Sequence, residues 1–335
     1  MSIPPPKFLP VLLGHGCFLR DENQRVMLDG YRNPYYLTPT TDAFLEMRPS
    51  KHSQQFWPTS LTKQVPENTS VVLLSIAVNT DCQREETITE VGYTIFDTAA
   101  IYDGAKGSRK KKIPGCVPPG PRGENIIKFA LSRHYIVRDT ASHHPGTCNS
   151  PAHTAQPYHF SYRKSEFINR VQVRGTLEEA FNKASSEGLT SEDVRRGARR
   201  AVVLVGWGEE NYHPQIRATN WYTSNWFFQH WDIRQYHIIK ERPFNPTYIS
   251  CLELFGIQHR AYGREIGNNA GNYSAFTMQL LIGLCFLTEQ QRYQLNRGQM
   301  LSPNPKFPGV ESVLARDNRP PGSRPLPAGH VPIIH

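Results

Sequence analysis

The sequence has little continuous hydrophobicity. Its longest apolar run, Leu280 to Leu287, is far shorter than the roughly 20 residues that a helix needs to cross a bilayer. The start of the chain also has no apolar stretch of the signal-peptide type. We therefore expect a soluble protein that has no membrane partner.

Paired cysteine spacings are missing as well. The six cysteines form no Cys-x-x-Cys pair, the spacing that is typical of structural zinc and redox sites. One loop carries side chains of zinc-ligand type, namely His143, His144, Cys148, His153 and His159. Its spacing is irregular and its composition rich in Pro, Ser and Thr, so we interpret it as an exposed loop. Free thiols indicate a reducing, intracellular location, in the cytoplasm or the nucleus.

Acidic residues are too few to balance the basic ones, and the 335-residue chain has a formal net charge of +9. Positive charge favours a polyanionic partner, although here it is spread over many segments. The 27 prolines, with 38% hydrophobic residues, indicate one α/β domain that carries irregular loops and tails. We expect an irregular N-terminal extension at 1–67, the domain at 68–290 and a Pro-rich C-terminal tail at 291–335.

Strands are predicted from short apolar, β-branched runs. Ser70–Asp81 and Ile88–Thr98, joined by a polar turn, form a hairpin pattern, and the first run is continuous enough for a central buried strand. Later strands are expected at His134–Asp139 and Ala201–Gly206.

Helices are predicted from caps and from helical spacing. Thr176 and Glu179 have the capping-box spacing of a helix start, and a second helix is expected from Thr190 to Arg200. A third is expected at Thr247–Phe255. The last continues through Leu287, with leucines spaced as on a single buried face.

Three segments resemble motifs of the DEDDh 3′→5′ exonucleases in the ribonuclease H-like superfamily. Ile88-Thr-Glu-Val-Gly92 is similar to that family's Ile-Thr-Glu-Ile-Gly, and Leu204-Val-Gly-Trp207 to Leu-Val-Gly-His. Asn268-Asn-Ala-Gly-Asn-Tyr-Ser-Ala-Phe-Thr277 resembles His-Asn-Ala-Gly-Asn-Asp-Ala-x-x-Thr. Tyr158–Ile168 resembles a segment of the fungal family named for the C-terminal domain of a "good for full DEAD-box helicase activity" protein. The resemblance implies a ribonuclease H-like α/β fold, a mixed sheet flanked by helices, with one of its strands at His230–Ile239. It also implies RNA as ligand.

The same resemblance implies where the catalytic groups of such an enzyme would lie. The family's metal-binding carboxylates and its general base fall on Ala77, Asn79, Tyr212, Asn268 and Tyr273. Two-metal phosphodiester cleavage needs several carboxylates that converge on Mg²⁺ or Mn²⁺. None of these five residues is a carboxylate. We therefore predict a degenerate site with no catalytic residue, no metal and no cofactor. The expected function is that of a pseudo-nuclease that binds nucleic acid, with RNA favoured over DNA, or a protein partner.

Two basic clusters are the candidate nucleic-acid contacts. One lies in a Pro- and Gly-rich loop at 104–123, and the other near the end of the helix expected to finish at Arg200. Their members are Arg109, Lys110, Lys111, Lys112, Arg195, Arg196, Arg199 and Arg200. The loop cluster also has the composition of a nuclear import signal or of a merely solvated run, and the helix cluster partly suits the helix dipole.

Two alternatives remain open on the sequence. The first is an active, metal-dependent 3′→5′ exonuclease with displaced ligands, which would draw on the remaining carboxylates Asp81, Glu90, Glu209, Glu210, Asp232 and Glu265. The second is a protein-interaction scaffold, suggested by the aromatic-rich segment Asn220–Trp231 and the Pro-rich tail. Phosphate-driven binding should weaken steeply with salt, whereas an apolar protein interface should not.

Overall fold

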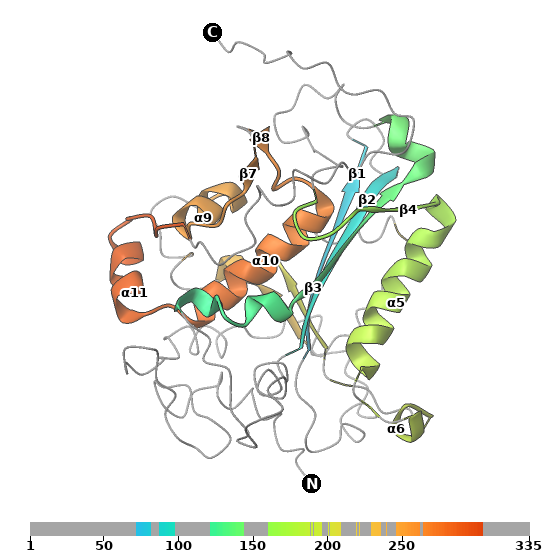
Figure 1. The fold of residues 1–335 in the computed structure, drawn as a ribbon, viewed down its shortest axis with the longest axis horizontal. Coiled ribbons are helices and arrows are strands. Elements are labelled where there is room, and N and C mark those ends of the chain that lie inside the picture. Colours follow the sequence, from blue (N-terminus) through green and yellow to red (C-terminus); the bar gives the residue numbers. More distant parts are fainter. Residues whose placement is uncertain are drawn as a thin grey trace, which may run out of the picture.

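The computed structural model describes residues 72–81, 87–97, 121–143, 160–187, 191–195, 200, 202–208, 229–235, 246–261 and 264–303, with positions 189, 219, 221 and 239. These residues build a mixed β-sheet between helices (Figure 1). Several segments discussed above lie outside the described residues. They are the N-terminal extension, the basic run 109–112, the loop residues of zinc-ligand type beyond His143, and most of the aromatic segment.

The described strands form one six-stranded sheet in the order β4-β3-β2-β1-β5-β6. They are β1 (Val72–Thr80), β2 (Ile88–Asp97), β3 (Leu131–Val137), β4 (Glu166–Ile168), β5 (Val202–Gly206) and β6 (Gln229–Asp232). β2 runs antiparallel to both β1 and β3, whereas β5 is parallel to β1 and to β6, and β4 is parallel to β3. A separate two-stranded hairpin pairs β7 (Arg260–Ala261) with β8 (Arg264–Glu265).

The predicted hairpin and later strands are present, with one early ending. β6 stops at Asp232 and continues as the 3-10 turn Ile233–Gln235, so the strand predicted to reach Ile239 is too long. The Asp232 carboxylate accepts the backbone N–H of Arg234 at 2.9 Å, which turns the chain out of the extended conformation.

β1 has two different faces, because successive strand residues point to opposite sides of a sheet. Leu74, Ile76 and Val78 belong to the hydrophobic cluster that contains the side chains of α5. Leu73 belongs to the other cluster, built on α10. By this alternation Ala77 and Asn79 face α10.

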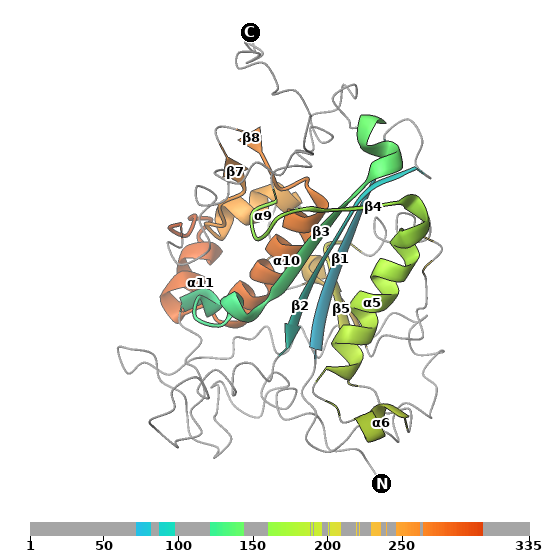
Figure 2. The ribbon, with the colours of Figure 1, turned by 45° about the vertical axis from the view of Figure 1, so that its right-hand side comes forward.

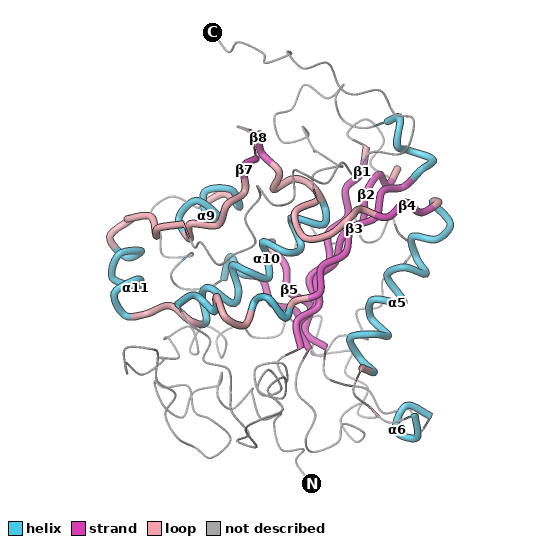
Figure 3. The backbone as a smooth tube through the Cα atoms, in the orientation of Figure 1, coloured by secondary structure: helices cyan, strands magenta, loops and turns pink. Residues whose placement is uncertain are grey.

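Helices cover both faces of the sheet. The described helices are α5 (Val173–Ser186), α6 (Ser191–Arg195), α9 (Tyr248–Leu254), α10 (Ala270–Cys285) and α11 (Glu289–Asn296). α10 lies across β1, β2, β3 and β5, and α5 packs on the opposite face (Figures 1 and 2). The strands, magenta in Figure 3, pass between these two helices.

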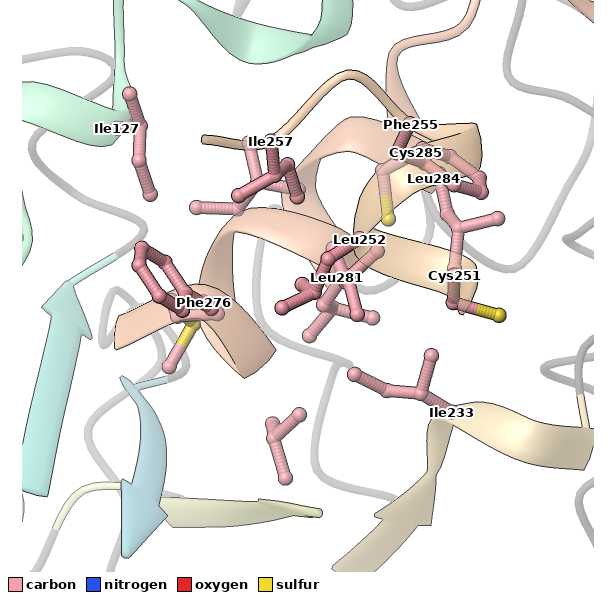
Figure 4. Packing of buried hydrophobic residues seen from close by; sticks show 14 of the residues in the cluster. Ile127, Ile233, Cys251, Leu252, Phe255, Ile257, Phe276, Leu281, Leu284 and Cys285 are labelled. Atoms are coloured by element: carbon pink, nitrogen blue, oxygen red, sulfur yellow. The ribbon is translucent and has the colours of Figure 1, made fainter. Parts of the chain in front are cut away.

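α10 is buried nearly all round, not on a single face as its leucine spacing predicts. Every residue from Ala270 to Cys285 except Tyr273 is buried. The sheet covers one side. On the other side, Leu252 of α9 lies beside Leu281, and Phe255, which follows α9, lies beside Leu284 and Cys285 (Figure 4). Taken singly, no helix in the described part of the chain could span a membrane, and the pair α10 with 290–296 that passes by length and composition together is bent by 112°.

The packed part of the chain extends beyond residue 290. α11 follows α10, capped by Thr288, whose hydroxyl accepts the N–H of Gln291 at 3.2 Å. Leu295 and Leu301 lie in the same cluster as α10. The predicted start of the tail at 291 is therefore too early.

α5 begins before the predicted cap. Asn169 and Gln172 form a capping box upstream, with the Asn169 N–H donating to Gln172 Oε1 at 2.8 Å. Thr176 is inside the helix, where its hydroxyl donates to the Gln172 carbonyl at 3.0 Å. The prediction that Thr176 caps the helix is wrong because Thr-x-x-Glu spacing also fits a helix interior, and only the preceding backbone decides between them.

The burial of Cys285 gives a pH-dependent prediction. Desolvation raises the pKa of this thiol from 9.0 to about 12. A raised folded-state pKa means that the thiol's contribution to stability is complete below pH 9 and is lost as the pH rises towards 12. In native protein at pH 8 to 9 we expect iodoacetamide to leave Cys285 unmodified, as read by peptide mass spectrometry, and to modify it readily in urea; equal modification in both states would contradict the packing.

Candidate functional site

Four of the five positions that the family resemblance assigns to a degenerate site lie at one end of the sheet. Ala77 and Asn79 occupy the last part of β1, and Asn268 and Tyr273 flank the first turn of α10. Asn79 Nδ2 donates to the Asn268 carbonyl at 2.6 Å, which joins the two segments directly. Tyr212 lies outside the described residues.

A buried carboxylate, Glu90, is the centre of the polar contacts at this end. Its Oε2 accepts hydrogen bonds from Asn79 Nδ2 at 3.3 Å, from the Ala270 N–H at 3.1 Å and from His134 Nε2 at 3.1 Å. The side chains of Glu90 and His134 are fully buried. Donors and the positive end of the α10 dipole are what a buried negative charge requires. We call Glu90, His134, Asn79 and the Ala270 N–H the Glu90 hub.

The hub extends to the segment before β4. His134 Nδ1 lies 2.9 Å from the hydroxyl of the buried Ser165, so both ring nitrogens of the imidazole have partners. The His134 ring also packs against Phe160, with centroids 5.4 Å apart. These roles of Glu90 and His134 were not predicted. Alternation along β3 could have indicated that His134 is buried, because every second residue of the strand, Ser132, His134 and Ile136, lies on one face.

Two motif glycines let the helix approach the sheet. A Cβ on Gly92 would lie 2.3 Å from the carbonyl carbon and oxygen of Ala270. A Cβ on Gly271 would lie 2.5 Å from Cβ of His134 and 2.7 Å from the ring of Phe160. Backbone contact of this kind brings the Ala270 N–H within reach of Glu90.

The retained asparagines have structural roles. Asn269 caps α10, since its Oδ1 accepts the Asn272 N–H at 3.0 Å. The Asn272 amide accepts the Ser161 N–H at 2.8 Å and donates to the Ile266 carbonyl at 3.0 Å. Both side chains are buried. These hydrogen bonds fix the neighbouring segments of the chain around α10, so we assign both asparagines a structural role.

An aromatic cluster occupies the motif positions on the other side of α10. The Tyr273 ring stacks on Tyr248 with centroids 4.2 Å apart, and Tyr248 meets Trp207 edge-on at 5.6 Å. The Tyr248 hydroxyl donates to the Tyr273 carbonyl at 2.9 Å. Burial, and then the nearby charge of Asp232, raise the pKa of Tyr273 well above its usual value. The phenol therefore stays neutral, which does not suit a ligand for a divalent cation.

Asp232 is also engaged within the fold. Its carboxylate accepts the Gly208 N–H at 2.8 Å and the Arg234 guanidinium at 3.2 Å. Gly208 has φ of 84°, and a Cβ there would lie 2.7 Å from the Arg234 guanidinium carbon. Across the described residues, no three His, Cys, Asp or Glu side chains come together as a group able to hold a metal ion.

The predicted basic residues differ in their burial and in their partners. Arg200 is buried, and its guanidinium makes a two-point ion pair with Asp97 at 2.7 and 2.5 Å and donates to the Glu187 carbonyl. This use contradicts its prediction as a nucleic-acid contact. Arg195 is exposed and pairs with Glu192 at 3.1 Å. Arg196 and Arg199, like Arg109, Lys110, Lys111 and Lys112, lie outside the described residues.

Comparison with known families agrees with this geometry. A family model described as "DNA polymerase III subunit epsilon-like, C-terminal domain", of the DEDDh type, matches residues 72–284, well over half of the chain. The match begins with β1 and ends in α10, so it covers the sheet and the helix that carries the last motif. Among curated proteins, none matches the chain. The chain therefore belongs to the DEDDh exonuclease-like family of DNA polymerase III epsilon-like C-terminal domains, within the ribonuclease H-like superfamily.

Proposed function

We propose that this domain is a non-catalytic member of its family, of the fungal branch, that binds single-stranded nucleic acid and RNA in particular. The observation that carries the proposal is the use made of the former ligand positions. Asn79 serves as a hydrogen-bond donor to a carbonyl, and Tyr273 is stacked on Tyr248. Side chains that are used for hydrogen bonding and ring stacking in this way are not placed to coordinate metal ions.

The chemistry of the donor set supports the same conclusion. Two divalent cations need hard, anionic oxygen ligands, and a methyl group, two amides and a neutral phenol offer none at Ala77, Asn79, Asn268 and Tyr273. Asn268 also lacks the basicity of the imidazole that stands there in the family motif. The donor set does not fit a metal pair.

The nucleic-acid half of the proposal rests on charge and on family likeness. The net charge of +9 favours a polyanionic ligand. Exonuclease-like domains as a family bind a nucleic-acid strand. RNA is preferred to DNA because of the resemblance of Tyr158–Ile168 to the fungal family. A protein partner bound through an apolar surface is the competing outcome.

The decisive measurement combines binding and cleavage. Labelled single-stranded RNA is titrated with the full chain, with and without Mn²⁺, and anisotropy and product length are read from the same samples. We expect binding that weakens steeply between about 50 and 200 mM salt, together with RNA of unchanged length. An absence of salt-sensitive binding to RNA or DNA would remove the nucleic-acid half of the proposal.

Cleavage would point to displaced ligands. Of the remaining carboxylates, Glu90 and Asp232 are already bound within the fold, whereas Glu209 and Glu210 lie outside the described residues. Shortening from the 3′ end that needs Mn²⁺, and that is lost in Glu209→Gln/Glu210→Gln, would overturn the pseudo-nuclease proposal.

A further inference from the structure

The segment that resembles the fungal family has a structural role that the degenerate site does not explain. Its inner residues fasten it to α10: Ser161 N–H donates to Asn272, and the Tyr162 hydroxyl accepts from Gln279 Nε2 at 2.6 Å. Ser165 is bound to His134, and Ile168 is buried in the core. The segment is thus held at several points beside α10, between Asn272 and Gln279.

The residues between these anchors are exposed cations. Arg163 and Lys164 are both exposed, and they stand between the buried residues Ser161 and Ser165. Their backbone is therefore fixed by its neighbours while their charges point to solvent. A fixed backbone lowers the entropy that is lost when such side chains bind a ligand.

Two further exposed cations lie at the other end of β4. Arg138 directly follows β3, and Arg170 follows β4 after one residue. Because β3 and β4 are parallel, with Val137 opposite Ile168, these two arginines emerge at the same end. The Arg170 N–H donates to Asp139 at 3.1 Å, which ties the two turns together (Figure 1).

The charges along this edge do not balance. Glu166 is paired with Arg133 at 2.9 Å, and Asp139, whose carboxylate accepts the neutral backbone N–H of Arg170, offsets at most one of the four cations described below. Within the described part of the chain, the side chains of Arg138, Arg163, Lys164 and Arg170 make no ion pair. We call these four residues the β4 cation row. The three residues of β4, Glu166–Ile168, separate Arg163 and Lys164 from Arg138 and Arg170 along the edge of the sheet.

We propose that the β4 cation row binds consecutive phosphates of a single-stranded nucleic acid and leads the strand past the N-terminus of α10. This inference rests on the proposed function and names its surface. A row of cations beside a strand edge follows a phosphate backbone without reading bases, so binding through it is tolerant of sequence and sensitive to salt. None of the four residues belongs to the two clusters predicted from the sequence.

The test compares two double variants of the full chain that each remove two exposed cations. Arg163→Gln/Lys164→Gln removes half of the row. The matched control, Lys128→Gln/Lys183→Gln, removes exposed lysines from the turn before β3 and from the last turn of α5. Affinity for a labelled single-stranded RNA is measured by anisotropy at several salt concentrations, and thermal melting shows that both variants are folded.

We expect the row variant to weaken binding by on the order of tenfold, and to lower the slope of log Kd against log salt by about 1.4, or 0.7 per lost single-strand phosphate contact. The control should leave both quantities close to wild type. Equal losses in the two variants, or none in either, would overturn the proposed surface while the RNA-binding proposal stands. If the wild-type chain itself binds no single-stranded RNA or DNA, the proposed surface fails together with the nucleic-acid half of the proposed function.

Discussion

Gly92→Ala is expected to destabilise the domain by about 3 kcal/mol or more, at the upper end of what overpacking costs. The new Cβ would lie 2.3 Å from two backbone atoms of Ala270 and 2.4 Å from the Gly271 nitrogen. Backbone cannot rotate away as a side chain can, so α10 would have to move off β2. That movement would also pull the Ala270 N–H from Glu90, which it now meets at 3.1 Å.

Gly175→Ala is the matched control. Gly175 lies in α5 and has nothing within 4 Å of the position of a Cβ. Alanine is favoured over glycine in a helix by roughly 1 kcal/mol, so this variant should be slightly more stable than wild type. Urea unfolding followed by circular dichroism measures both. Similar stability of Gly92→Ala and wild type would show that α10 does not rest on the β2 backbone.

Glu90→Ala is expected to cost about 3 kcal/mol or more, because it leaves buried hydrogen-bond donors without their acceptor, at roughly 1 to 3 kcal/mol each. Three donors would lose their common acceptor, among them the fully buried imidazole of His134. Nothing else on the described residues accepts from His134 Nε2. Glu90→Gln should cost less, because a carbonyl oxygen of the same reach still accepts.

The comparison for this prediction is Glu166→Ala. Glu166 has 49% of its side chain exposed and pairs with Arg133 near the surface, so its loss should cost less than about 1 kcal/mol. The same urea titration reads both variants. A Glu90→Ala protein as stable as Glu166→Ala would mean that water reaches the Glu90 hub and replaces the missing carboxylate.

The strands and the register of the motifs could be predicted from the sequence. Apolar β-branched runs identified β1 and β2, and the motif letters placed Asn79 and Asn268 at the same site before any contact between them was known. Prediction worked here because a strand's side-chain alternation and a glycine's need for space are local properties. The burial of α10 is different, since it depends on α9 and α11, which no helical period reveals.

The basic residues show a second limit of prediction from the sequence. Arg200 belongs to a cluster that looks uniform in the sequence, but its partner Asp97 is 103 positions away. Long-range pairing of this kind decides whether an arginine is buried or exposed. It cannot be predicted from a run of basic residues in the sequence. The β4 cation row was not predicted because Arg163 and Lys164 form no long charge run, and Arg138 comes close to Arg170 only through the parallel pairing of β3 with β4.

The hydrogen bond from Asn79 to the Asn268 carbonyl also bears on whether this site could regain catalysis. A carboxylate at position 79 would set an acceptor against that carbonyl, 2.6 Å away, and against Glu90, where the amide now donates. Repulsion would be relieved only by a cation, which needs ligands that Ala77 and Tyr273 do not supply. Under the proposed non-catalytic function, a metal site would therefore require several simultaneous substitutions, because the hydrogen bonds around position 79 make a single one unfavourable.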